Sequence, residues 1–169
     1  MTDFTQAEMT ELTRLLNKVA ANGGYWPDET TMRAAHGVVS VWAPELVITR
    51  LNQRGETEIL LAMYEGGAEF FNGLWHIPGG YNRWPEKDVQ ETCSRVAMRE
   101  IGVNVRYTRT MDVYKWQTGE HPYGHPLSVY ASCRPAGKIT ESGKLRFFPK
   151  NDTPENLVVP HRRFIQNYL

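Results

Sequence analysis

A Pro-Gly-Gly turn placed just ahead of one amphipathic helix constrains the fold more than any other feature. Pro78, Gly79 and Gly80 end the apolar stretch 74–77, and Glu86 opens a segment, 86–101, with helical periodicity. One face of that segment collects the apolar residues Val89, Cys93, Val96, Ala97 and Ile101 at spacings of three and four. Gly102 then supplies a stop signal. The pattern predicts a strand–turn–helix unit, with glycines where the backbone can approach a ligand closely.

The remaining pattern predicts strands flanked by helices. Helices are expected over 4–21 and 161–168, and a linker over 25–35. Val- and Ile-rich or alternating stretches predict strands over 37–42, 45–51, 58–64, 74–77, 103–114, 126–133 and 144–148, with Ala43-Pro44 breaking the first two apart. This order predicts a three-layer α/β fold. We expect an N-terminal helix and linker, 1–35, followed by one globular domain, 36–169.

Composition excludes several classes of function. The 19 basic residues of this 169-residue chain balance 19 acidic ones, so no overall field favours nucleic acid or an anionic membrane. No apolar run approaches the roughly 20 residues of a membrane span. Cys93 and Cys133 lack metal-ligand spacing and suit free thiols in a reducing compartment. Because residues 1–9 resemble no signal peptide, the chain is expected to be cytoplasmic.

Glu100 is the first candidate for chemistry. It borders the apolar face of the predicted helix, one turn beyond Val96. A carboxylate at such a border is costly unless it is paired or bound to metal. An ion pair with Arg95 or Arg99, or exposure at the helix end, is the alternative reading.

The segment from Gly80 to Val103 resembles the Nudix box, in which G, five residues, E and seven residues precede R-E-U-x-E-E-x-G-U. The Pro-Gly-Gly turn, Arg95, Glu100 and Gly102-Val103 match that pattern. Val96 and Arg99 replace two of its glutamates, and one extra residue separates Gly80 from Arg95. The resemblance implies the Nudix α/β/α sandwich with a mixed sheet, to which the N-terminal helix would be an addition.

The resemblance also implies a metal site. The Gly79 carbonyl and Glu100 would bind Mg²⁺ or Mn²⁺, a cation that withdraws charge from a diphosphate and orients it for attack by water. Glu86 matches the early box glutamate if the extra residue follows it. Arg95 matches the box arginine, which braces a catalytic carboxylate or meets phosphate charge.

The altered box is similar to that of GDP-mannose mannosyl hydrolases. Residues 94–102 share with that branch an Arg, an aliphatic and a small residue, Met, and then Glu-aliphatic-Gly. The branch uses one cation and cuts the sugar carbon–oxygen bond. Its loop histidine has no counterpart beside Glu141, which Ser142 follows.

Candidates for the remaining roles come from loops. Glu141 precedes an Arg-Phe-Phe stretch that resembles a late Nudix segment, so it is either a metal ligand, a general base or a solvated glutamate. His125 is either a general base at the mouth of the site or a surface histidine, since prolines and Gly124 forbid a helical metal pair with His121. Tyr81 and Trp84 either stack on a nucleobase or cover the core. Arg83 either meets phosphate or is solvated.

The resemblance therefore predicts a magnesium-dependent Nudix hydrolase of a nucleoside diphosphate linked to another group, most simply a nucleotide sugar. Two alternatives stay open. The chain binds a nucleotide without cleaving it and acts as a sensing module, or it is an ADP-ribose-type pyrophosphatase. A small-molecule nucleotide is the expected partner, and the amphipathic first helix makes a homodimer a candidate.

Overall fold

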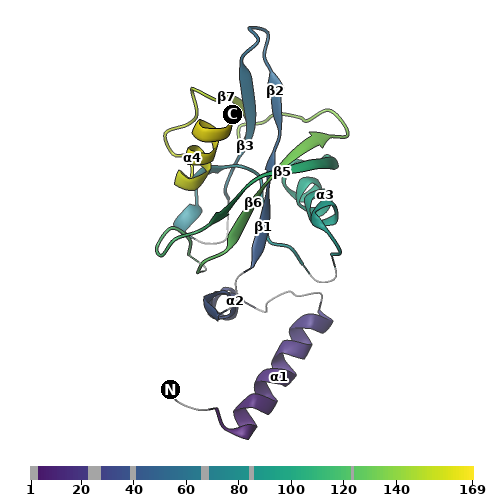
Figure 1. The fold of residues 1–169 in the computed structure, drawn as a ribbon, viewed down its shortest axis with the longest axis vertical. Helices are drawn as coiled ribbons and strands as arrows, with labels where there is room; N and C mark the ends of the chain where they lie inside the picture. The colour runs from purple at the N-terminus through teal and green to yellow at the C-terminus, as the bar shows by residue number, and fades with distance from the viewer. Residues whose placement is uncertain (1–3, 23–27, 39–40, 66–68, 84–85, 123) are drawn as a thin grey trace.

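Helices lie on two sides of a twisted arrangement of strands (Figure 1). The computed structural model describes residues 4–22, 28–38, 41–65, 69–83, 86–122 and 124–169. Its elements in chain order are α1 (Gln6–Ala21), α2 (Glu29–Val38), β1 (Trp42–Val47), β2 (Thr49–Leu51), β3 (Thr57–Met63), the 3-10 turn η1 (Glu69–Phe71), β4 (Trp75–His76), α3 (Val89–Glu100), β5 (Val105–Lys115), β6 (Leu127–Pro135), β7 (Leu145–Pro149) and α4 (Val159–Tyr168).

The strands form two sheets. The first has the order β1-β6-β5, in which β1 and β6 run parallel and β5 and β6 run antiparallel. In the second, β3 pairs antiparallel with β2, β4 and β7. Parallel and antiparallel pairs therefore occur together, as expected for the mixed sheet of an α/β/α sandwich.

Helices α3 and α4 cover opposite faces of the strands (Figure 1). Leu46 and Leu60 pack in one buried cluster with the apolar face of α3, which contributes Cys93, Val96, Ala97 and Ile101. Their neighbours in sequence, Val47 and Leu61, pack in a second cluster with Phe164 and Ile165 of α4. Alternate side chains of a strand point to opposite faces, so β1 and β3 each supply both cores.

The prediction for residues 25–51 was partly wrong. Residues 29–38 form α2, where a linker and the start of a strand were expected. The Asp28 carboxylate accepts from Thr31 N at 2.8 Å, which supplies the N-terminal cap of a helix. Pro44 lies inside β1 and pairs with Val129. Its fixed φ is compatible with extended backbone, so Ala43-Pro44 does not break the strand.

Helix α3 begins at Val89, three residues later than the predicted start. Asp88 caps it by accepting from Glu91 N at 2.9 Å. The helix ends at Glu100, and Gly102 adopts a φ of 68°, the left-handed conformation that favours glycine. Glu100 therefore lies in the last turn of α3, and Glu86 lies before its first turn.

Helix α1 begins with a capping box, in which Thr5 and Glu8 satisfy each other's backbone N–H groups. Its apolar residues are about half exposed, with fractions of 48% for Leu12, 46% for Leu15 and 47% for Leu16. The homodimer through this helix stays a prediction, as does the domain boundary at residues 35 and 36, which falls inside α2. Within the described ranges, no helix is both long and apolar enough to cross a membrane.

A chain of buried polar groups interrupts the core where β1 runs parallel to β6. Ser128 donates to Glu45 Oε1 at 2.7 Å, and Trp116 Nε1 donates to Ser128 Oγ at 2.8 Å. His161 of α4 lies on the other side, with its Nε2 at 3.8 Å from Glu45 Oε2. Glu45, Ser128 and His161 are 6%, 1% and 3% exposed. A carboxyl group in such surroundings is stable only when neutral or well paired.

Burial decides the protonation states of Glu45 and His161. Burial, with a smaller contribution from the charge of Glu100, raises the pKa of Glu45 to about 8. The hydrogen bond from Ser128 acts in the opposite direction. Burial also holds the pKa of His161 well below its usual range. The His161 Nδ1 accepts from Ile77 N at 2.9 Å, so its proton lies on Nε2 toward Glu45. Both groups are therefore neutral near pH 7, and their contact is not an ion pair.

The raised pKa of Glu45 predicts a pH-dependent stability. Between pH 4.5 and about 8 the folded chain keeps a proton on Glu45 that the unfolded chain releases. The free energy of unfolding therefore falls as pH rises, by at most about 1.4 kcal/mol per pH unit from this group. Glu45→Gln should remove that slope. Urea unfolding of both chains between pH 5 and 8 checks it, and equal slopes would show that Glu45 is ionised in the folded chain.

The packing of α4 against the strands should contribute to stability mainly through one aromatic contact. Phe164 is 3% exposed, and its ring stacks on Tyr130 with centroids 3.9 Å apart. Phe164→Ala leaves a cavity there and should lower the free energy of unfolding by about 3–5 kcal/mol. Val159→Ala, at a residue 56% exposed on the same helix, should change it by less than about 0.5 kcal/mol. Urea denaturation measures both, and similar losses would contradict the packing described.

Candidate functional site

The Pro-Gly-Gly turn is held as an extra strand along β1. Leu46 N donates to the Pro78 carbonyl at 2.7 Å, and Asn82 N donates to the Trp42 carbonyl at 3.0 Å. Between these bonds Gly79 forms an antiparallel bridge with β1. The turn therefore has a fixed backbone path, which places the Gly79 carbonyl in front of the last turn of α3.

Side chains approach both glycines of the turn closely. A Cβ at Gly79 would lie 2.0 Å from Glu45 Oε2, and a Cβ at Gly80 would lie 2.5 Å from Arg99 Nη2. Neither glycine has a positive φ, so the requirement is space and not conformation. The turn is thus pressed between the buried carboxyl of Glu45 and the guanidinium of Arg99.

Glu100 and the Gly79 carbonyl share one hydrogen-bond donor, the guanidinium of Arg99. Arg99 Nε donates to Glu100 Oε1 at 2.6 Å, and Arg99 Nη2 donates to the Gly79 oxygen at 3.1 Å. The side chains of Arg99 and Glu100 are 46% and 23% exposed. Two of the oxygens predicted to bind metal therefore share one positively charged partner. Of the two arginines proposed as ion-pair partners of Glu100, Arg99 is the one that forms the pair.

Arg95 instead holds Glu86. Its Nε and Nη2 donate to the Glu86 carboxylate, and Nη2 also donates to the Tyr81 carbonyl at 2.7 Å. Glu86 accepts further bonds from Arg83 N at 2.7 Å and Thr92 Oγ1 at 2.9 Å. Burial alone would raise the pKa of Glu86, but Arg95 and these donors hold it below its usual range. This pair joins α3 to the loop that carries the turn, so both side chains are used for bracing.

Glu141 lies beside a different pair of strands. It accepts from Arg50 of β2 at 2.8 Å and from the backbone N of Phe147 in β7 at 3.0 Å. Partial burial acts to raise the pKa of Glu141, but these two donors lower it below its usual range. Arg50 also pairs with Glu58 and lies over the Phe147 ring. Among the described residues no hydrogen bond or ion pair links Glu141 to the box.

His121 contacts Tyr81 of the turn, whereas the role of His125 as a general base stays a prediction. His121 Nε2 lies 3.3 Å from the Tyr81 hydroxyl, and its ring contacts Phe71 and Trp116 edge to face. His125 is exposed and contacts the Trp116 carbonyl through Nδ1 at 3.3 Å. Tyr81 therefore belongs to a cluster of rings that closes one side of the turn.

The other two predicted substrate contacts are less defined. Arg83 is partly buried, and its backbone N–H binds Glu86. Trp84 lies outside the described residues. No structural account of it can be given.

The predicted metal ligands are thus divided. Gly79 and Glu100 come together, whereas Glu86 and Glu141 are held by Arg95 and Arg50. Within the part of the chain that the structure describes, no three His, Cys, Asp or Glu side chains gather closely enough to hold a metal ion. The donor set at the box is one carbonyl and one carboxylate. These are hard oxygens of the kind that Mg²⁺ prefers, and that ion usually keeps several waters and shares substrate phosphates.

Two features of this site were not singled out from the sequence. Glu45 interrupts the apolar stretch 41–48, and a lone carboxylate in such a stretch is a usable signal for a buried polar group. The bridging position of Arg99 depends on the path of the turn over α3, which no local pattern encodes. Both side chains contact the Gly-Gly pair.

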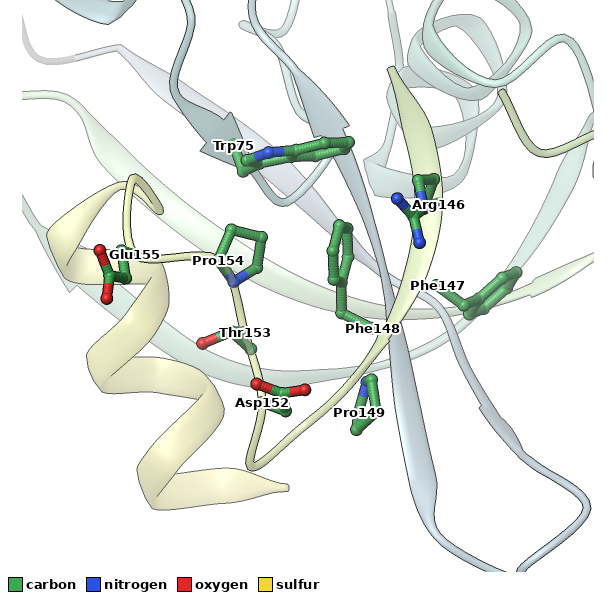
Figure 2. Close-up of a pocket in the computed structure, with 9 residues that line it drawn as sticks. All are labelled: Trp75, Arg146, Phe147, Phe148, Pro149, Asp152, Thr153, Pro154 and Glu155. Carbon is green, nitrogen blue, oxygen red and sulfur yellow. The ribbon is translucent and has the colours of Figure 1, made fainter. Parts of the chain in front are cut away.

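A pocket lies beside β7 and shares none of these residues. Trp75, Phe148 and Pro154 face one another there, and Arg146 and Asp152 are at its rim (Figure 2). The Trp75 and Phe148 rings meet edge to face with centroids 4.8 Å apart. Glu100 and the Pro-Gly-Gly turn are not part of this pocket, so it is separate from the candidate site.

Solved structures of known proteins share this fold. A MutT NUDIX hydrolase from Burkholderia pseudomallei superposes with a TM-score of 0.62 at 20% identity, over 78% of this chain and 99% of that one. The NUDIX domain of Shewanella oneidensis NrtR, solved with ADP ribose, gives 0.59 at 17% identity over 96% of both chains. An ADP-ribose pyrophosphatase from Streptococcus suis gives 0.52 at 18% identity, over 75% of this chain and 90% of that one.

The sequence itself identifies the family. No curated protein matches the chain significantly. The family model of the NUDIX domain, however, matches residues 42–168, a span that includes every strand and both helices of the sandwich. The chain belongs to the Nudix family.

Proposed function

We propose that this chain is a Nudix-type hydrolase whose substrate is a nucleoside diphosphate linked to another group. The observation that carries the proposal is that the Gly79 carbonyl and Glu100 both accept hydrogen bonds from the guanidinium of Arg99. Oxygens arranged around a cation are what a diphosphate-cleaving site of this family requires. The family match and the fold of the hydrolases named above support the same conclusion.

A divalent cation, Mg²⁺ or Mn²⁺, fits this donor set. Gly79 and Glu100 would hold it, because one guanidinium already reaches both of their oxygens. When bound, the cation supplies electrostatic stabilisation of charge that develops on the diphosphate. Glu86 and Glu141 remain candidate ligands only if they leave Arg95 and Arg50.

The chain's own residues then have distinct tasks. Arg95 positions the loop by fixing Glu86 and the Tyr81 carbonyl. The Tyr81 ring and His121 would border the group attached to the diphosphate. Glu141 and the exposed His125 are the candidates for the general base, since each carries a group that can accept a proton from water.

The substrate class follows from two lines of support. The similarity of residues 94–102 to mannosyl hydrolases favours a nucleotide sugar that is cut at the sugar carbon–oxygen bond. The similarity to an ADP-ribose pyrophosphatase favours cleavage between the two phosphates, and the NrtR domain solved with ADP ribose favours the same ligand. We place the nucleotide sugar first because its support lies in the box of this chain.

A second candidate function is nucleotide binding without cleavage. It is favoured by the replacement of two box glutamates with Val96 and Arg99 and by the position of Arg99 at the cation point. In that case the chain would sense a nucleotide, as a Nudix-fold module without turnover. Fold alone does not decide between the two functions.

Product analysis separates these candidates. The chain is incubated with nucleotide sugars and ADP-ribose, with and without Mg²⁺, and the products are separated by chromatography. Nucleoside diphosphate with free sugar supports the leading proposal. Nucleoside monophosphate with a sugar phosphate supports the pyrophosphatase. Binding of a nucleotide without products supports the sensing module.

Glu100→Gln tests the site within the hydrolase. Loss of the carboxylate charge should lower kcat/KM on the order of 100-fold, because a group that stabilises charge in the transition state is removed. Glu91→Gln, at an exposed position on the same helix, is the matched control and should keep full activity. Steady-state kinetics measure both variants. Unchanged kcat/KM in Glu100→Gln would place the reaction elsewhere on the molecule.

A further inference from the structure

The structure assigns to Arg99 the role of a resident cation that competes with the divalent cation for the Gly79 carbonyl and Glu100. This assignment rests on the proposed function, since it concerns the same oxygens. It explains a substitution that the box pattern alone leaves as a defect. An acidic position of the pattern carries a basic side chain, and that side chain lies where positive charge is needed.

Direct contacts carry the first step. The guanidinium gives one N–H to Glu100 Oε1 at 2.6 Å and another to the Gly79 oxygen at 3.1 Å. A divalent cation bound by these oxygens would lie beside the positive guanidinium. The two positive charges repel, so binding of the ion favours a conformation in which Arg99 has withdrawn.

The turn has space for this guanidinium. A Cβ at Gly80 would lie 2.5 Å from Arg99 Nη2 and 3.4 Å from Arg99 Cζ. Because Gly80 has no side chain, the planar group can lie directly against the turn.

Arg99 is also able to withdraw. Its side chain is 46% exposed, it lies on the last turn of α3, and a long arginine stem can carry the charge into solvent. An exposed ion pair of this kind is weak, so it lowers metal affinity without abolishing it. A released Arg99 stays within reach of the phosphates that accompany the metal.

The competition predicts a change in metal binding that can be measured without turnover. Mn²⁺ is titrated into the wild-type chain, Arg99→Ala and Arg99→Gln, and free Mn²⁺ is followed by electron paramagnetic resonance. Both variants should bind Mn²⁺ more tightly by up to about fivefold, the size expected when one partly exposed ion pair is removed. Arg106→Ala, which removes an exposed arginine from β5, should leave the affinity unchanged. Thermal unfolding of each chain confirms that all are folded.

The outcomes separate this assignment from the proposed function. Equal Mn²⁺ affinity in the wild-type chain and both Arg99 variants would overturn the assignment while leaving the metal site intact. Equal gains in Arg99→Ala and Arg106→Ala would also overturn it, since a general charge effect would then suffice. No Mn²⁺ binding in any of the chains would overturn both the assignment and the metal site of the proposed function.

Discussion

The pairing of the Pro-Gly-Gly turn with β1 is the constraint on which the candidate site depends. Backbone bonds between Leu46 and Pro78 and between Trp42 and Asn82 fix the turn at both ends. The turn is thereby pressed against Glu45 on one side and the end of α3 on the other. Any change that separates the turn from β1 would move the Gly79 carbonyl away from Glu100, even if every side chain of the box were kept.

Three glutamates around this turn differ in burial and in the groups that contact them. Glu45 is buried beside neutral partners, and its pKa is raised to about 8. Glu86 is also largely shielded, but Arg95 and backbone N–H groups hold its pKa below its usual range. Glu100 is more exposed and pairs with Arg99. Residue type alone therefore says little about which carboxylate can bind a cation, whereas the donors around each one decide it.

The sequence could predict much of the fold because most elements leave a local signal. The apolar face of α3 is buried as its spacing predicted, and Gly102 ends the unit. The local signals were misleading in two places. Asp28 caps α2 in a segment that was expected to be a linker, and Pro44 was expected to break a strand that pairing with β6 maintains. The metal-binding roles of Gly79 and Glu100 stay predictions, and the partners of Glu86, Glu141 and Arg99 come from contacts between elements that no local pattern encodes.

The altered box is better understood as a change of charge than as a loss of ligands. Relative to the family pattern, Val96 removes one negative charge and Arg99 replaces a second with a positive one, so the end of α3 gains three units of positive charge. Positive charge in this region attracts a diphosphate even before a metal binds, and it lowers the affinity of the region for a free divalent cation. The phosphates of a bound nucleotide would restore the negative charge that Val96 and Arg99 have removed. The divalent cation should therefore bind more tightly to the nucleotide complex than to the free chain.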